Sequence, residues 1–338
     1  MNYTAQQAME GRCTLGAAVH LFPRSRYCQR LYYPTVARAW APLLSLTGSW
    51  AWLFSAITVA FVLIAPTTTI AAEAQANRMV VEYVPPINPA HQALYQRLME
   101  RRVLEKLQEV FSPFRLPVEL KLRTVGCDGV SNAWYQKPAA GSSSPPTVSV
   151  CYEYLAEIEQ SLPPGTTPAG ITPMDAMVGQ FFYVFAHEMG HAMFDVLGIP
   201  VFGREEDAAD NFATYLMLRF GDEESRALIT GAAYSYNKYV QGSQITVPLA
   251  AFSDAHSAPA QRFYNLLCTA YGSDPTRYGD FVEKGYLPKS RAGSCMREYK
   301  TTAFAFRELI SPHVDKELAM QVLGKNWLQN IKGPLPQN

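Results

Sequence analysis

The sequence predicts an α+β fold in which a small antiparallel or mixed sheet precedes a mainly helical half. Residues 118–125 alternate apolar and polar side chains, with the period of two that is typical of a half-buried strand. Two further short runs, residues 133–135 and 147–151, also have the composition of strands. From residue 173 onward, by contrast, apolar residues recur at helical spacing, which indicates packed helices.

Charge is distributed unevenly along a chain that is neutral as a whole. The 338 residues include 29 Lys and Arg and 29 Asp and Glu. This balance excludes a general nucleic-acid binder, because phosphate neutralisation needs a cationic excess. Residues 1–38 nevertheless contain five arginines and a single acid, Glu10, so this segment carries +4 and the rest of the chain −4.

A long apolar segment follows the basic one. Residues 39–72 contain no charged residue, and residues 43–65 are apolar enough and long enough to cross a bilayer as a helix. The sequence Ala-Glu-Ala-Gln-Ala at 72–76 also fits a signal-peptidase site. We therefore interpret residues 39–76 as either a cleaved signal peptide or an uncleaved transmembrane anchor.

Both interpretations place the body of the protein outside the cytoplasm. The basic segment 1–38 is processed in the first case and stays cytoplasmic in the second, as the positive-inside rule requires. The protein is then either exported to the periplasm or the extracellular space, or anchored in the inner membrane with its body outside. Contact with a membrane is expected only through the uncleaved apolar segment.

The first half of the body contains the predicted sheet. Residues 77–89 have the composition of a proline-rich connector, and residues 90–111 show the apolar spacing of a first amphipathic helix. The strand at 118–125 comes next. Residues 133–135 and 147–151 then flank a loop rich in Gly, Ser and Pro, which predicts a hairpin.

The second half is predicted to be helical. A short helix is expected from about residue 153 to 161, before a Pro-Pro-Gly sequence. Thr172-Pro173 is typical of the start of a helix, which we expect to continue to Leu197, where Gly198 and Pro200 stop it. Residues 203–220 form the next predicted helix. No linker divides the body, so residues 77–338 are predicted to form one domain.

Four cysteines follow the apolar segment: Cys127, Cys151, Cys268 and Cys295. An even number suits two disulfides in an oxidising compartment. Of the three possible pairings, we favour Cys127–Cys151 and Cys268–Cys295, because each closes a local loop. Four buried free thiols are the alternative. Nothing in their spacing has the C-x-x-C pattern of a zinc knuckle or a redox site.

The long predicted helix contains His187-Glu188-Met189-Gly190-His191. Histidines at positions i and i+4 lie on one helical face, so both imidazoles can reach one ion while the glutamate lies near its open side. This arrangement supplies two nitrogen ligands for Zn²⁺, and Glu188 as general base for a zinc-bound water. Two hydrogen-bonded core histidines are the alternative, but Glu188 would then add a third polar group that needs a partner.

The next helix begins with the acidic sequence Glu205-Glu206-Asp207-Ala208-Ala209-Asp210. A carboxylate from an adjacent antiparallel helix is a suitable third zinc ligand, and it leaves the fourth position for water or substrate. Asp210, one turn after Glu206, can accept the other ring hydrogen of a ligand histidine. The alternative is an acidic first turn that complements the helix dipole.

Together, His187-Glu188-x-x-His191 and Glu206-x-x-Ala209-Asp210 resemble the motifs of the gluzincin metallopeptidases. The stretch from Asn132-Ala-Trp-Tyr135 to Arg262-Phe-Tyr-Asn-Leu-Leu-Cys268 is more similar to the bacterial metallopeptidase family known as DUF4344. The resemblance implies a zincin-like helical half, with His187, His191 and Glu206 as zinc ligands and Glu188 as general base. The spacing of 15 positions between His191 and Glu206 is shorter than in the better studied gluzincins, which leaves Glu205 as a second candidate.

His256 is a further catalytic candidate, in a polar loop before a helical run. In related zinc peptidases a histidine or tyrosine outside the metal shell stabilises the oxyanion, and His256 could have this role. A solvent-exposed loop histidine or a helix cap is the alternative. We expect Arg262 to orient Asp254 or to bind a substrate carboxylate, and Asp195 to be a surface or capping residue that could line the cleft. Tyr236 and its neighbouring tyrosines are expected in the core or at an interface.

These features predict a zinc-dependent hydrolase that cleaves peptide bonds outside the cytoplasm. Its partner is a peptide or protein substrate, and the strand at 133–135 is the expected site of pairing with an extended substrate. One alternative is a non-catalytic envelope protein with a structural or vestigial zinc site. Another is a zinc hydrolase that acts on a non-peptide amide, because it would need the same residues.

Overall fold

The computed structural model describes residues 75–76, 78–240 and 249–327. All of them belong to the unit formed by residues 67–338. Within these residues, no helix combines the length and apolar character that crossing a membrane requires. The apolar segment at 43–65, on which the choice between signal peptide and anchor depends, lies outside the described residues.

A four-stranded mixed sheet forms the first part of the body, with the order β2-β4-β6-β5. Strands β2, β4 and β6 are parallel to one another, and β5 runs antiparallel to β6. The bounds are β2 Met79–Tyr83, β4 Leu120–Val125, β5 Ala133–Gln136 and β6 Thr147–Cys151. A separate antiparallel pair consists of β1 Gln75–Ala76 and β3 Arg115–Leu116. The predicted small mixed sheet and its hairpin are therefore confirmed, and β5 is at one edge.

The interpretation of residues 77–89 as a connector is wrong for its first part. Residues 79–83 form β2, which pairs with β4 from Met79 opposite Leu120 onward. The run Met-Val-Val-Glu-Tyr has strand composition, but its partner lies 41 residues away, so a local pattern does not reveal the pairing. The three prolines of this region, Pro85, Pro86 and Pro89, follow the strand, where they cost no ladder hydrogen bond.

The predicted helix over residues 90–111 is divided in two. The 3₁₀ turn η1 (Pro89–His91) leads into α1 (Gln92–Glu100), and α2 (Val103–Phe111) follows after a break. At the break Arg102 adopts a left-handed conformation, with φ 49° and ψ 51°. A left-handed non-glycine residue cannot continue a right-handed helix. Because of the break, both α1 and α2 bury leucines in the core.

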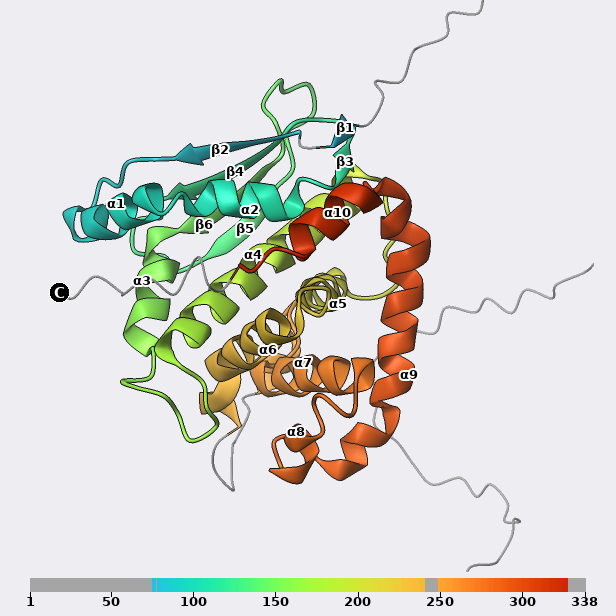
Figure 1. The fold of residues 1–338 in the computed structure, drawn as a ribbon. Coiled ribbons are helices and arrows are strands. Elements are labelled where there is room, and N and C mark those ends of the chain that lie inside the picture. Colours follow the sequence, from blue (N-terminus) through green and yellow to red (C-terminus); the bar gives the residue numbers. More distant parts are fainter. Residues whose placement is uncertain (1–74, 77, 241–248, 328–338) are drawn as a thin grey trace, which may run out of the picture. The chain divides into compact units, whose positions relative to one another are not determined.

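Helix α4 (Pro173–Val196) is the central element of the body. Thr172 and Asp175 form a capping box and Pro173 occupies the first turn, as the start signal predicts. The helix contacts β5 and β6 on one side and α5 and α6 on another. Figure 1 shows α4 running between the sheet and the helical half.

The remaining helices complete the predicted helical half. The predicted helices at 153–161 and 203–220 correspond to α3 (Tyr152–Ser161) and α5 (Glu205–Met217). The other α-helices are α6 Asp222–Tyr236, α7 Pro259–Ser273, α8 Asp280–Glu283, α9 Lys289–Ala305 and α10 Lys316–Leu323. Short turns are η2 Asn237–Tyr239, η3 Leu249–Phe252, the π-helical η4 Phe306–Ile310 and η5 Ser311–His313.

A close approach of α4 and α5 positions the two sequence motifs. A Cβ on Gly190 would lie 3.1 Å from Cα of Ala209 and 3.4 Å from Cβ of Phe212. Because Gly190 has no side chain, the backbones of α4 and α5 can lie closer together than a larger residue at this position would allow. Because Gly190 is next to His191 and Ala209 is next to Asp210, this contact brings the histidines of α4 to the acidic start of α5.

Both favoured disulfides are present. Cys127–Cys151 joins the loop after β4 to the end of β6, and Cys268–Cys295 joins α7 to α9. The Cα–Cα distances are 5.6 and 5.0 Å. Structural disulfides are typical of proteins outside the reducing cytosol. The other two cysteines, Cys13 and Cys28, lie outside the described residues.

Candidate metal centre

His187 and His191 face the same direction from α4. Their side chains are 2% and 13% exposed, and their Nε2 atoms lie 3.2 Å apart. The two rings are nearly perpendicular, with centroids 4.9 Å apart. This is the convergence that the i, i+4 spacing predicts for two imidazoles that share one ion.

Glu206, on the first turn of α5, completes a triangle with the two histidines. Its Oε2 atom lies 3.0 Å from Nε2 of His187 and 3.3 Å from Nε2 of His191. Tetrahedral zinc with bonds of 2.0–2.1 Å holds its donor atoms about 3.3–3.4 Å apart. The triangle therefore has approximately the size of one face of such a tetrahedron. Two imidazole nitrogens and a carboxylate oxygen are also a donor set that zinc accepts.

Two further carboxylates determine which nitrogen each histidine presents. Nδ1 of His187 lies 2.8 Å from Oδ1 of Asp210, and Nδ1 of His191 lies 2.8 Å from Oε1 of Glu205. Because an ionised carboxylate can only accept a hydrogen bond, each Nδ1 carries the proton and donates it. In a neutral imidazole, Nε2 then presents a lone pair. In that neutral form the two Nε2 atoms direct lone pairs at each other and at the Glu206 carboxylate, as ligands of one shared cation would; without a cation, a second proton on Nε2 of His187 can instead be donated to Glu206.

The electrostatics of the triangle favour a cation. Burial opposes the charged form of His187, but hydrogen bonds with Asp210 and Glu206 raise its pKa to about 9. The hydrogen bond with His187 lowers the pKa of Glu206 to about 2. A site that attracts a proton this strongly has a negative electrostatic potential. The same potential attracts a divalent metal ion, which can bind both histidine nitrogens and the Glu206 oxygen at once.

Asp210 is held in place by Arg262, from α7. Nε and Nη2 of Arg262 donate to Oδ2 and Oδ1 of Asp210 at 2.8 and 2.6 Å. Burial raises the pKa of Asp210, but the hydrogen bond from His187 and the charge of Arg262 hold it well below its usual range. The guanidinium also lies 5.8 and 5.4 Å from the ring centroids of Tyr183 and Tyr236. Arg262 was expected to orient Asp254 or to bind a substrate carboxylate. In the structure its guanidinium is instead paired with Asp210, which it orients.

Glu188 points toward the cleft and is 7% exposed. Burial raises the pKa of its carboxyl group, whereas the positive charges of His187 and His191 and a hydrogen bond with the backbone of Tyr135 act in the opposite direction. A buried carboxylate with a raised pKa is suited to accept and release a proton near neutral pH. The structure thus places Glu188 between the histidines and the edge strand β5.

Asp195 connects β5 to the end of α4. The hydroxyl of Tyr135 donates to Oδ2 of Asp195 at 2.6 Å, and Lys137 forms an ion pair with the other oxygen. From the sequence, Asp195 is expected to be a surface or capping residue that could line the cleft. Tyr135 and Asp195 are 60 residues apart, so nothing in the local sequence around Asp195 indicates this contact.

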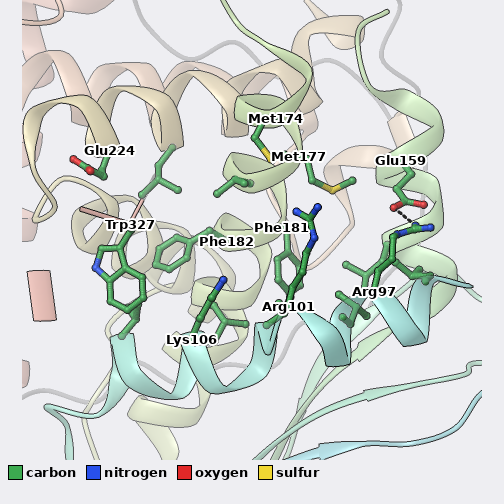
Figure 2. Close-up of a pocket in the computed structure, with 18 of the residues that line it drawn as sticks. Arg97, Arg101, Lys106, Glu159, Met174, Met177, Phe181, Phe182, Glu224 and Trp327 are labelled. Atoms are coloured by element: carbon green, nitrogen blue, oxygen red, sulfur yellow. Dashed lines mark hydrogen bonds and ion pairs between the residues drawn. The ribbon is translucent and has the colours of Figure 1, made fainter. Parts of the chain in front are cut away.

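A cleft of about 740 Å³ opens over these residues. It is lined by β5, by His187, Glu188 and His191 of α4, by Glu206, and by Tyr236 and His256. Its size is within the range of ligand-binding clefts. A second cavity of about 340 Å³, between α1, α2 and α4, is lined mainly by apolar side chains such as Phe181 and Trp327 (Figure 2). No histidine or cysteine lines this second cavity, whereas the candidate metal ligands line the first.

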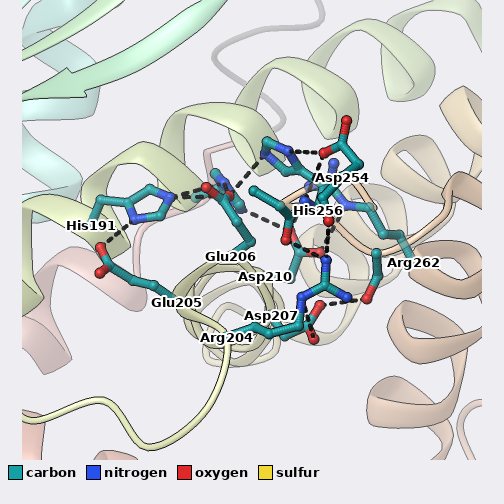
Figure 3. A network of polar contacts seen from close by, with 12 residues as sticks. His191, Arg204, Glu205, Glu206, Asp207, Asp210, Asp254, His256 and Arg262 are labelled. Carbon is teal, nitrogen blue, oxygen red and sulfur yellow. Dashed lines mark hydrogen bonds and ion pairs between the residues drawn. The ribbon is translucent and has the colours of Figure 1, made fainter. Parts of the chain in front are cut away.

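His256 approaches the triangle from the loop before α7. Its Nε2 atom lies 2.9 Å from Oε2 of Glu206, and its Nδ1 atom lies 3.2 Å from Oδ1 of Asp254 (Figure 3). The side chain is 45% exposed. The structure thus brings all the predicted ligand and catalytic residues to one cleft. Arg204, which no sequence motif singles out, donates hydrogen bonds to the backbone carbonyls of Asp254 and Ala255.

The fold brings an H-E-x-x-H helix, an edge strand and a second, acidic helix together at one candidate metal centre. Residues 83–310 match the model of the DUF4344 family, which is described as "Putative metallopeptidase". This match covers about two thirds of the sequence, and the chain belongs to that family. No curated protein and no solved structure matches the chain.

Proposed function

We propose that the protein is a zinc-dependent peptidase that hydrolyses peptide bonds in the cleft between β5, α4 and α5. The observation that carries this proposal is the triangle of His187 Nε2, His191 Nε2 and Glu206 Oε2, with sides of 3.0–3.3 Å. The buried Glu188 beside this triangle adds the general base that a purely structural metal site does not need.

His187, His191 and Glu206 would hold the ion. Bound Zn²⁺ would supply Lewis acidity, which lowers the pKa of a water molecule and polarises a carbonyl group. Glu188 accepts the proton of the attacking water at its carboxylate and delivers it to the leaving amine. Asp210, fixed by Arg262, keeps the His187 ring in the orientation that directs Nε2 into the cleft.

The edge strand β5 supplies the surface that would align a peptide. Among the described residues, β5 pairs with β6 on one side and with no strand on the other. An extended peptide can add to such an edge through main-chain hydrogen bonds. Asp195 holds Tyr135 and Lys137 of this region against the end of α4. This arrangement favours an extended peptide over a compact small molecule as the substrate.

The proposed location is outside the cytoplasm. The two disulfides support it, because such bonds persist in oxidising compartments. The apolar segment at 43–65 and the basic segment before it supply either an export signal or an anchor in the inner membrane. The choice between these two is part of the proposal and depends on whether the chain is cleaved near residue 76.

One observation favours the second candidate function, a non-catalytic protein with a structural zinc site. His256 offers a fourth protein donor 2.9 Å from Oε2 of Glu206, and structural sites have four protein ligands. Against this candidate, Glu188 is a buried carboxylate in the cleft whose pKa is raised. An assay of the Glu188→Gln variant separates the two functions.

The test compares wild-type protein with Glu188→Gln, both as full chains with intact disulfides, on a library of unstructured peptides. Loss of the general base should lower the cleavage rate by about 10²–10⁴-fold and leave the bound zinc unchanged. The control is Glu119→Gln, the same change at an exposed glutamate outside the cleft, which should cleave like wild type. Equal cleavage by wild type and Glu188→Gln would refute the proposed mechanism.

A further inference from the structure

Three histidines, and not two, surround one carboxylate oxygen in the cleft. The Nε2 atoms of His256, His187 and His191 lie 2.9, 3.0 and 3.3 Å from Oε2 of Glu206. Each of these rings also has a carboxylate oxygen at Nδ1. These oxygens belong to Asp254 at 3.2 Å, Asp210 at 2.8 Å and Glu205 at 2.8 Å (Figure 3). His256 therefore repeats the arrangement of the two motif histidines.

The repeated arrangement has the same chemical consequence for His256. Its Nδ1 faces Asp254 at 3.2 Å and its Nε2 faces Glu206 at 2.9 Å, and both carboxylates can only accept hydrogen bonds. When Nδ1 donates to Asp254, Nε2 of the neutral ring presents a lone pair toward Glu206. That lone pair points at the carboxylate of Glu206, and this contact is repulsive unless a cation lies between them. The donor atoms of His187, Glu206 and His256 all lie within 4.8 Å of one another, and this group does not extend to His191. The rings of His191 and His256 must therefore draw closer together when one ion binds all four donors.

The loop that carries His256 is fastened to the helix that carries Glu206. Arg204, immediately before α5, donates to the backbone carbonyl of Asp254 at 2.6 Å and also to that of Ala255. The hydroxyl of Ser257 donates to Oδ1 of Asp207, on the first turn of α5, at 2.6 Å. Contacts on both sides of His256 therefore hold its ring over Glu206.

We propose that His256 is the third imidazole ligand of the metal in the resting protein, together with His187, His191 and Glu206. Four protein donors fill a tetrahedral zinc ion, so substrate must displace one of them before it can reach the metal. His256 is the ligand that leaves, because its side chain is 45% exposed whereas those of His187 and His191 are 2% and 13% exposed. His256 would leave the ion as a donor atom of the substrate takes its place, without any change of oxidation state.

This inference rests on the proposed function, because both need zinc at His187, His191 and Glu206. It adds that the resting site is closed and that His256 closes it. If His256 were only an oxyanion donor, as the sequence analysis suggests, it would stay off the metal at rest. The number of imidazoles on the zinc distinguishes these roles without any measurement of activity.

The experiment is X-ray absorption at the zinc edge on the full chain, where imidazole rings give a countable outer-shell signal. We expect three imidazoles in wild type, two in His256→Gln, and three in the control His313→Gln, whose histidine lies outside the cleft. A peptide hydroxamate, which brings two oxygen donors, should lower the wild-type count from three to two. Zinc affinity should fall by more than about 100-fold in His256→Gln, beyond the range of about 10–100-fold for the loss of an outer hydrogen-bond partner of a ligand.

The possible failures are distinguishable. Two imidazoles in wild-type protein, with unchanged zinc affinity in His256→Gln, would overturn the third-ligand assignment and leave the proposed function intact. Three imidazoles that persist with the hydroxamate bound would overturn the displacement of His256. Wild-type protein that binds no zinc would overturn the proposed function and, with it, this inference.

Discussion

The histidines of the candidate centre direct Nε2 into the cleft because a carboxylate binds each Nδ1. Asp210 does this for the most buried ring, that of His187, and is itself held by two hydrogen bonds from Arg262. Glu205 does it for His191 at a more exposed position. The two neighbouring acids Glu205 and Glu206 therefore have different partners, although the sequence alone left either as the third ligand.

The pair Glu205→Gln and Glu206→Gln tests this difference. Glu206→Gln should lower zinc affinity by more than about 100-fold, the upper range for the loss of an outer hydrogen-bond partner, because an amide oxygen carries no charge for the metal. Glu205→Gln should lower it by about 10-fold or less, because its carboxylate contacts only Nδ1 of His191 and is 57% exposed. Competition with a chelator of known affinity measures both. The reverse order would identify Glu205 as the ligand.

How far the site could be predicted depends on the sequence distance between partners. His187, Glu188 and His191 could be named because helical spacing alone fixes their geometry. The contact of Arg262 with Asp210 spans 52 residues, and the contact of Tyr135 with Asp195 spans 60. Neither partner can be identified without the fold, so Arg262 was expected to act on Asp254 or on a substrate.

At the scale of elements, α4 is held by unusually close contacts with its neighbours. At the crossing of α4 and α6, a Cβ on Gly231 would lie 1.9 Å from the carbonyl oxygen of Asp175, and one on Gly179 would lie 2.6 Å from the backbone nitrogen of Ala232. These two helices therefore meet backbone to backbone. Glycine is required here for packing, and this crossing fixes α4 beneath the sheet.

Gly231→Ala should therefore destabilise the fold. The new methyl group meets backbone, which cannot move away as a side chain can, so the free energy of unfolding should fall by at least about 1–3 kcal/mol. The control is Gly293→Ala in α9, where no atom lies within 4 Å of the added carbon, and it should gain about 0.4–1 kcal/mol. Urea unfolding followed by circular dichroism measures both. Equal stability of Gly231→Ala and wild type would contradict the close crossing.

The elements differ in how much local sequence defines them. The start of α4 could be predicted because Thr172, Pro173 and Asp175 supply cap, first turn and reciprocal hydrogen bond within four residues. The break between α1 and α2 could not, since an arginine rarely adopts the left-handed conformation seen at Arg102. Strand β2 was missed because its pairing with β4 is parallel and non-local.

At the scale of the whole molecule, the two disulfides support the proposed location of the body outside the cytoplasm. The paired cysteines are 24 positions apart in the sheet region and 27 positions apart in the helical half. Residues 1–38 carry a net charge of +4 and the rest of the chain carries −4. Overall neutrality therefore describes neither of them.

Removal of the second disulfide should weaken the helical half. In the chain-entropy model a disulfide that closes a loop of this length contributes about 3.5 kcal/mol to the free energy of unfolding. The double variant Cys268→Ala/Cys295→Ala should lose about this free energy and therefore unfold at a lower urea concentration. The matched control Cys13→Ala/Cys28→Ala removes two cysteines of the amino-terminal segment and should leave the midpoint unchanged. An unchanged midpoint in the first variant would show that the bond between α7 and α9 does not stabilise the fold.

The central claim is that His187, His191 and Glu206 hold zinc in a catalytic cleft. The most direct measurement is the zinc content of the purified full chain after dialysis, determined by inductively coupled plasma mass spectrometry for three proteins. Wild type and Glu188→Gln should each retain one zinc ion per chain, because Glu188 is not a ligand, and the double variant His187→Gln/His191→Gln should retain none. A metal-free wild type, or a double variant with as much zinc as wild type, would contradict the claim.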